Sequence, residues 1–185
     1  MDAALKTEAL RILQGEGAIL EVAREVSRVL RETGVRGAVI GGVATVLHGH
    51  VRTTMDVDVF VPAPAAAFAD ALRRSGFNFD AARGEFRKRG VPVHLVLEAQ
   101  TGAAPTELED IDGVRTVSLA DLLNLKLRSG MRSLTRAQDL ADVLGLIRAR
   151  GLSGEFAARI DKPLRAEFRK LVRAIEAERS GAASG

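Results

Sequence analysis

The 185-residue sequence contains no cysteine, no tryptophan and no tyrosine, and it has only three histidines. Without cysteine there is no disulfide and no thiolate metal site, so any metal must be held by carboxylates or by those histidines. Carboxylates suit hard cations such as Mg²⁺ and Mn²⁺. The seven phenylalanines are scattered, so the sequence offers no aromatic platform for stacking single-stranded nucleic acid.

Long apolar runs and a strong charge bias are missing as well. No stretch approaches the length needed to cross a bilayer, and residues 1–17 lack the basic-then-apolar pattern of a signal peptide. We therefore expect a cytoplasmic protein without a membrane partner. The 27 basic residues nearly balance the 24 acidic ones, and a net charge of +3 permits an RNA or phosphate partner without requiring one.

Apolar periodicity predicts a mixed first half and a helical second half. A period near 3.6 predicts helix over residues 4–33, and Gly34 ends it. Short β-rich runs predict strands at residues 35–40, 56–61, 85–89, 91–97 and 114–117. Further helical patterns cover residues 43–50, 65–75, 119–129, 134–150 and 163–179, and residues 99–113 read as a loop.

These patterns predict four regions along the chain. They are an N-terminal helical segment (1–34), an α/β core (35–117), a C-terminal helical region (118–180) and a disordered tail (181–185). The length suits one domain, or one domain with a helical extension.

Two carboxylates lie inside an apolar strand pattern in the stretch GGVATVLHGHVRTTMDVDVFV, residues 41–61. If the strand begins early, Asp56 and Asp58 share one face with Arg52 and Thr54, while Met55 faces the core with the valines. A buried carboxylate needs a positive partner, which here is either an arginine or a metal. Solvated acids or a pair with Arg52 are the plainer alternatives, but the apolar surroundings favour a metal.

Gly41 and Gly42 close the preceding strand, where backbone N–H groups can approach a phosphate closely. A glycine pair alone most often marks a tight turn, and Asp-x-Asp alone is an equally weak signal. Their spacing within about 20 residues is more specific, because the glycines can serve the phosphates and the aspartates the metal of one ligand.

The stretch 41–61 resembles the signature of the nucleotidyltransferase superfamily, which has the DNA polymerase β-like fold. It is closest to abortive-infection toxins and minimal bacterial nucleotidyltransferases. Those toxins also carry a lysine in one helix and Arg-x-x-Asp-x-x-Asp in the next, which here match Lys126, Arg136, Asp139 and Asp142. The resemblance covers about residues 35–148 and implies an α+β fold: a small mixed β-sheet core flanked by helices, with a helical C-terminal part.

The resemblance implies transfer of a nucleotide from a nucleoside triphosphate to an acceptor hydroxyl. Asp56 and Asp58 would bind Mg²⁺ (or Mn²⁺), and Lys126 and Asp139 would assist catalysis. The acceptor would be a tRNA or a protein side chain, with the protein acting as the toxin of a toxin–antitoxin pair and its cognate antitoxin as a partner. A small-molecule-modifying transferase is a second enzyme hypothesis. The nucleotide-binding residues implied are Gly41, Gly42, Arg52, Thr54 and Arg136.

One position departs from the family pattern. The family usually has a third carboxylate on a neighbouring strand, where the stretch VPVHLVLE places His94. Either His94 substitutes for that acid, or the protein is a degenerate member that binds nucleotide or a protein partner without turnover. Plainer alternatives also remain open: His94 as an ordinary strand residue, Lys126 snorkelling on an amphipathic helix, and Arg136 with Asp139 as a surface ion pair.

Overall fold

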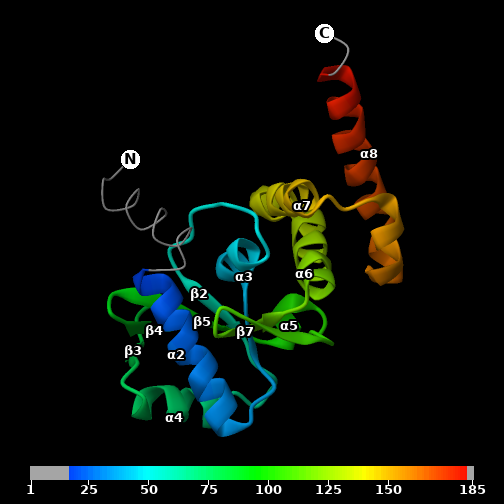
Figure 1. Ribbon diagram of the computed structural model, residues 1–185. Coiled ribbons are helices and arrows are strands. Elements are labelled where there is room, and N and C mark those ends of the chain that lie inside the picture. The colour runs from blue at the N-terminus through cyan, green and yellow to red at the C-terminus, as the bar shows by residue number, and fades with distance from the viewer. Residues whose placement is uncertain (1–16, 183–185) are drawn as a thin grey trace. The chain divides into compact units, whose positions relative to one another are not determined.

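Residues 17–182 are described by the computed structural model, and they divide into two units (Figure 1). The first unit contains the chain up to Leu47 together with Val51–Ser118. The second contains His48–His50 and the chain from Leu119 onward. The first part of the predicted N-terminal helix, residues 4–16, lies outside the described residues.

A mixed sheet forms the first unit. In the described part of the chain it has seven strands in the order β3-β4-β5-β2-β1-β7-β6. β2 runs antiparallel to β1 and parallel to β5, and β7 runs parallel to β1. The predicted α+β class is therefore confirmed. The strands are β1 (Ala38–Ile40), β2 (Val57–Phe60), β3 (Asn78–Asp80), β4 (Glu85–Lys88), β5 (Val91–Val96), β6 (Leu108–Ile111) and β7 (Val114–Val117).

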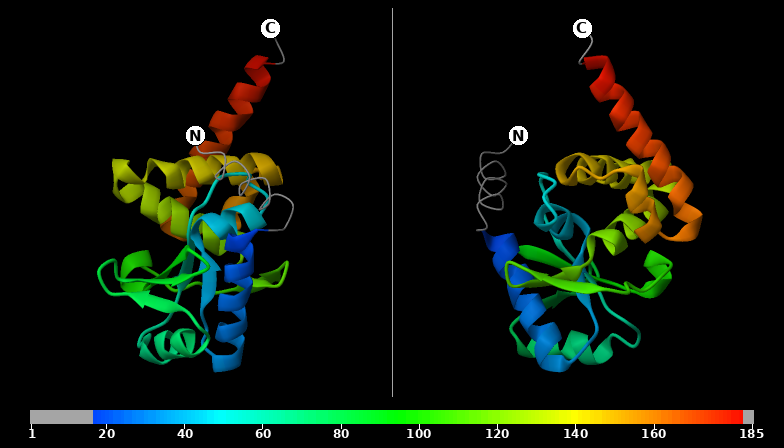
Figure 2. Two further views of the ribbon diagram at one scale, coloured as in Figure 1. Left: turned by 90° about the vertical axis from the view of Figure 1, so that its left-hand side faces the viewer. Right: turned by 45° about the vertical axis from the view of Figure 1, so that its right-hand side comes forward.

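Helix α2 covers one face of this sheet, as Figures 1 and 2 show. Its apolar stripe is buried, and Gly34 ends the helix in the left-handed conformation at φ 68°. Val57 and Val59 of β2 and Val93 of β5 belong to the same core and are fully buried. The helices of this unit are α2 (Ala18–Thr33), α3 (Gly41–Leu47), α4 (Ala66–Arg74) and α5 (Glu98–Thr101).

Side chains alternate between the two faces of each strand, so burial of one face in the core determines which side chains are available to form a functional site. Because successive strand residues point to opposite faces, the valines of β2 and β5 enter the core under α2. Asp58 lies between Val57 and Val59, and His94 lies between Val93 and Leu95, so both project from the other face.

The second unit is helical, as predicted. Leu123 and Leu127 of α6 are fully buried, as are Val143 and Leu146 of α7, the helix that α6 contacts most. Figure 2 shows α8 as the long last helix of this unit. Its elements are α6 (Leu119–Arg132), η1 (Leu134–Arg136), α7 (Ala137–Arg150), η2 (Gly154–Arg159), η3 (Lys162–Leu164) and α8 (Arg165–Ala182).

The loop predicted for residues 99–113 is wrong over its second half, which contains β6. β6 pairs antiparallel with β7. The two strands are joined by Asp112 and Gly113, which both have positive φ, 52° and 80°. An Asp-Gly pair between strands is a strong hairpin signal because it supplies both left-handed residues of a tight turn. The acidic residues of β6 hide the apolar pattern expected of a strand. They are tolerated because β6 is an edge strand, whose polar side chains need no burial.

The early start predicted for β2 is also wrong. β2 begins at Val57, so Arg52 and Thr54 lie on the connection before the strand. Met55, which was expected in the core, is 59% exposed because strand alternation does not extend to it. Similarly, α3 begins at Gly41 and ends at Leu47, earlier than the pattern at 43–50 indicated. α8 continues through residues 181 and 182 of the predicted tail, and residues 183–185 lie outside the described part.

We predict that Gly130→Ala destabilises the second unit. A β-carbon at Gly130 of α6 would lie 2.7 Å from Cγ of Leu140 on α7. Overpacking of this kind costs about 1–3 kcal/mol, which exceeds the roughly 1 kcal/mol that alanine gains over glycine in a helix. Denaturant unfolding followed by circular dichroism should show a lower free energy of unfolding.

Gly154→Ala is the matched control, because no atom lies within 4 Å of its added β-carbon. Its free energy of unfolding should stay within about 0.5 kcal/mol of the parent. Equal stabilities for the two variants would show that the contact between α6 and α7 is looser than the geometry indicates.

Candidate functional site

A row of ionisable side chains crosses three neighbouring strands of the first unit. Asp58 of β2 pairs with His94 of β5 in the parallel ladder. In the antiparallel ladder between β4 and β5, Phe86 pairs with Val93, so the next position places Glu85 beside His94. All three lie on the face opposite the valine core, because they alternate with core residues along their strands.

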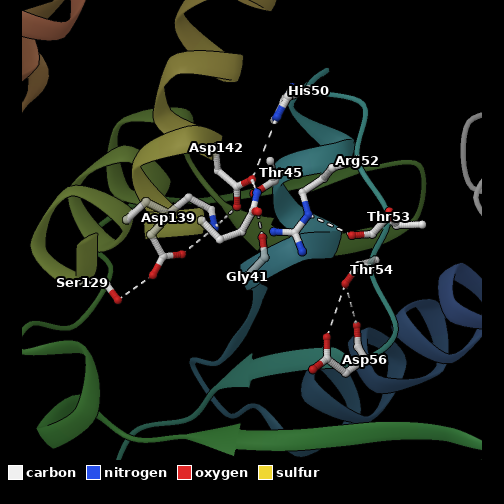
Figure 3. Close-up of polar contacts among 12 residues, drawn as sticks. Gly41, Thr45, His50, Arg52, Thr53, Thr54, Asp56, Ser129, Asp139 and Asp142 are labelled. Carbon is white, nitrogen blue, oxygen red and sulfur yellow. Dashed lines mark hydrogen bonds and ion pairs between the residues drawn. The ribbon is translucent and has the colours of Figure 1, made fainter. Parts of the chain in front are cut away.

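Asp56 joins this row from the residue just before β2. The Thr54 hydroxyl donates to Asp56 Oδ1 at 3.3 Å and to its backbone oxygen at 3.4 Å, as Figure 3 shows. Thr54 is buried, and a β-carbon on Gly42 would lie 2.3 Å from its Oγ1. The glycine at position 42 thus makes room for the residue that orients the first aspartate.

The imidazole of His94 faces both aspartates with one nitrogen and Glu85 with the other. Nδ1 lies 3.4 Å from Asp56 Oδ2 and 3.4 Å from Asp58 Oδ1. Nε2 lies 3.1 Å from Glu85 Oε2. One ligand atom each from Asp56, Asp58 and His94 fall within 4.8 Å of one another. Two carboxylate oxygens and one imidazole nitrogen at this spacing are a donor set that fits a divalent cation.

His94 is also the side chain that can supply the positive charge that the two aspartates require. Partial burial lowers the pKa of His94, but the hydrogen bond to Glu85 and the negative charges of Asp58 and Asp56 together outweigh it. The pKa of His94 is therefore raised above its ordinary value of 6.5. When protonated, the ring donates toward carboxylates on both sides and offsets part of their mutual repulsion.

Gly41 lies against the second aspartate. It follows β1 directly and has a φ of 66°, and a β-carbon there would lie 2.2 Å from Asp58 Oδ2. Any larger residue would displace that carboxylate. The glycine is therefore explained by its contact with Asp58, while its predicted approach to a phosphate stays a prediction.

The second unit contains its own buried ionic cluster. Lys126 is 5% exposed, and its Nζ lies 2.6 Å from Asp142 Oδ2 and 3.1 Å from Asp139 Oδ1. Ser129 Oγ donates to Asp139 at 2.6 Å, and Gln138 donates to Asp142 at 2.9 Å. Figure 3 shows Asp142 also facing the ring of His50, whose Nε2 is 4.0 Å from Oδ1. Lys126 is thus paired inside the unit and does not snorkel to the surface.

The predicted site residues therefore fall into two groups, one in each unit. Arg52 belongs to the first, where its Nε donates to the Thr53 carbonyl at 3.0 Å. Arg136 belongs to the second and is exposed at the end of η1. The first group is Gly41, Gly42, Arg52, Thr54, Asp56, Asp58 and His94, and the second is Lys126, Arg136 and Asp139.

Sequence reasoning missed Glu85 as a partner of His94. The predicted hairpin around Gly90 contained the signal, because counting outward from its turn puts Glu85 opposite His94. Asp142 was recognised only as part of a motif, and its complete burial at 0% exposure was not foreseen. Burial of an acid in a helix is hard to predict when the lysine that pairs with it lies 16 residues away.

We predict that Lys126→Met lowers the stability of the second unit. The substitution leaves Asp142 fully buried without its cation, and breaking a buried pair in this way costs about 3–5 kcal/mol. Lys170→Met is the control, because Lys170 is 70% exposed and its pair with Glu167 lies at the surface. Thermal and denaturant unfolding should separate the two variants clearly. Equal stability would indicate that Asp142 retains other compensation.

We predict that the pKa of His94, measured by NMR titration of its ring protons, lies above 6.5 and falls in Glu85→Gln. The stabilisation from these contacts is complete below the unfolded-state pKa and is lost as the pH rises through the higher folded-state pKa. Asp70→Asn, a surface change on α4, should leave the titration unchanged. A His94 pKa at or below 6.5 would contradict the geometry.

No helix in the part of the chain that the structure describes is both long enough and apolar enough to span a bilayer.

Comparison with known proteins finds relatives by structure only. No protein-family model matches the sequence, and no curated protein matches it. A nucleotidyltransferase-like antigenic protein from Paracoccidioides brasiliensis matches with a TM-score of 0.53 and 20% identity, over 89% of both chains. A protein from H. pylori, named as a candidate nucleotidyltransferase, matches with a TM-score of 0.55 and 13% identity, over 96% of this chain and 97% of its own.

The TM-scores establish the fold, and at identities of 13–20% the similarity extends to the fold alone. The abortive-infection subtype stays a prediction. The chain has the fold of nucleotidyltransferase-like proteins, with a mixed sheet and a helical C-terminal part.

Proposed function

We propose that the protein is a metal-dependent nucleotidyltransferase that moves a nucleotide from a nucleoside triphosphate onto an acceptor hydroxyl. One observation carries the proposal: Asp56, Asp58 and His94 present ligand atoms within 4.8 Å of one another. Asp58 and His94 lie on the face of the sheet opposite the valine core, with Gly41 against Asp58, in a fold shared with nucleotidyltransferase-like proteins. A simple ion pair would need one acid, whereas here two carboxylates and an imidazole are directed at one point.

The reaction forms a bond from the acceptor oxygen to the α-phosphorus and breaks the bond from that phosphorus to the oxygen bridging it to the β-phosphate. Pyrophosphate leaves with the electron pair, and the hydroxyl proton passes to a base. A divalent ion bound to the aspartates would supply neutralisation of phosphate charge.

The chain's own contribution is positioning. Thr54 orients Asp56, and Gly41 lets the backbone lie close to Asp58 without displacing its carboxylate. His94 spreads the charge of the cluster toward Glu85. In the second unit, Asp139 accepts hydrogen bonds from Lys126 and Ser129, which favours a positioning role over proton transfer.

The finer parts of the proposal rest on the sequence resemblance. It implies Mg²⁺ or Mn²⁺ as the ion, a tRNA or protein side chain as the acceptor, and a toxin–antitoxin setting. Arg136 is exposed and free to reach a phosphate of such an acceptor or nucleotide. The sequence gives no marker of an acceptor pocket for a small molecule, so the small-molecule-modifying enzyme has no separate support.

A second candidate function is nucleotide or partner binding without turnover. The observation that favours it is the imidazole of His94 at the position of the family's third carboxylate, 3.4 Å from each aspartate. With one acid fewer, the cluster holds a cation less strongly and provides a weaker base.

Calorimetry and label transfer test both candidates. The protein should bind a nucleoside triphosphate only with a divalent ion, and Asp58→Asn should weaken this binding at least about tenfold, because it removes one charge and one ligand from the site. Asp70→Asn on α4 is the control, since it removes an exposed acid that pairs only locally with Arg73 among the described contacts.

Incubation with each radiolabelled triphosphate and total cellular RNA should then label RNA or protein, and Asp58→Asn should abolish the label. Binding without any label on RNA, protein or small molecules would support the second candidate. Nucleotide binding that depends neither on the divalent ion nor on Asp58 would contradict both candidate functions.

A further inference from the structure

We infer that His94 is a metal ligand and that it sets the metal preference of this site, so that the site takes a divalent first-row transition ion such as Mn²⁺ in preference to Mg²⁺. The inference rests on the proposed function for the statement that the cluster is a metal centre. It adds which class of ion the centre selects and which residue makes the selection.

The donor set differs from one built of carboxylates alone. Mg²⁺ is a hard ion that prefers oxygen and keeps much of its water, so it gains little from an imidazole. Replacing a carboxylate with a neutral ring also removes one negative charge that would attract it. Carboxylates suit Mn²⁺ as well, but as a first-row transition ion Mn²⁺ accepts an imidazole nitrogen more readily than Mg²⁺ does, and the metal–nitrogen bond offsets the lost charge. Asp56 and Asp58 with His94 therefore favour the transition ion.

The geometry around the ring matches that of a ligating histidine. Nδ1 faces Asp56 and Asp58, and Nε2 is bonded to Glu85 at 3.1 Å. Metal-bound histidines almost always donate their second nitrogen to a carboxylate or carbonyl, which fixes the ring and raises its basicity. Here the nitrogen toward the two aspartates is the one left to bind metal, and the nitrogen away from them has the carboxylate behind it.

Glu85 is held in place for this role. It is only 8% exposed, and Nε of Arg87 lies 3.0 Å from its Oε1. Its position opposite His94 follows from the pairing of β4 with β5, which places its side chain on the same face of the sheet as the imidazole. The partly exposed imidazole of His94 is supported by the charged side chain of Glu85 on the neighbouring strand. An ordinary surface histidine has no need of such a support.

The rival explanation is that the row is purely structural, with His94 bridging three carboxylates to hold β2, β5 and β4 together. In the rival, Nδ1 carries a proton and donates toward Asp56 and Asp58, and no ion selectivity is expected. Metal binding measured on the purified full-length protein distinguishes the two, because it is independent of turnover.

The experiment titrates Mn²⁺ into the protein by electron paramagnetic resonance, with and without a nucleoside triphosphate, and lets Mg²⁺ compete. We expect Mn²⁺ to bind at least about tenfold more tightly than Mg²⁺. Pulsed electron paramagnetic resonance should detect hyperfine coupling between the bound Mn²⁺ and a histidine nitrogen. Labelling with ¹⁵N-histidine identifies that nitrogen as one from histidine.

Substitutions then assign the preference to single residues. His94→Asp should remove the nitrogen coupling and lower the Mn²⁺/Mg²⁺ affinity ratio about tenfold, because it restores a third carboxylate. Glu85→Gln should keep the coupling and weaken Mn²⁺ binding about tenfold, the usual size of an outer-shell effect. Glu98→Gln is the matched control, because Glu98 is an exposed acid at the start of α5 and should change neither value.

His94→Gln, which keeps a similar size and adds no charge, serves as the second variant if His94→Asp does not fold, and it too should lose the coupling. Mn²⁺ bound without histidine coupling, or an affinity ratio unchanged in the His94 variants, would overturn the inference and leave the proposed function intact. If neither Mn²⁺ nor Mg²⁺ binds, with or without a nucleoside triphosphate, both this inference and the proposed function would be overturned.

Discussion

The first unit depends on one electrostatic constraint: three carboxylates converge on a single imidazole. Asp56, Asp58 and Glu85 approach His94 from both sides of its ring, in a region that is only partly solvated. Without a positive charge at the centre these acids would repel one another, and the strands that carry them could not lie side by side at low cost. When His94 is protonated, its ring supplies that charge, and a divalent ion bound to Nδ1 would take the place of the proton there and supply a larger charge.

The core under α2 makes this arrangement possible. Alternation along β2 and β5 sends the valines inward, so the polar residues between them have no other face to occupy. The same alternation places Glu85 on that face one strand further along. Packing of the apolar face of the sheet therefore also brings Asp58, His94 and Glu85 together on the polar face.

Much of this could be predicted from the sequence, and the limits have physical causes. The Asp56–Asp58 pair and His94 were identified because period-two alternation and a family resemblance depend on local sequence. Glu85 was missed because its contact depends on pairing between strands, which requires the register of the hairpin to be counted. Met55 was misplaced because alternation predicts a face only where a strand is hydrogen-bonded to a neighbour, and β2 begins after it.

Two glycines of the first unit differ in what would make a substitution costly. At Gly34 the left-handed backbone is the single requirement, since no atom lies within 4 Å of an added β-carbon and an asparagine could adopt the same conformation. At Gly41 two requirements coincide, because the backbone is left-handed and the space is filled by Asp58. Gly34 could therefore be replaced at a modest cost in stability. Gly41 could be replaced only if the Asp58 side chain moved or changed as well.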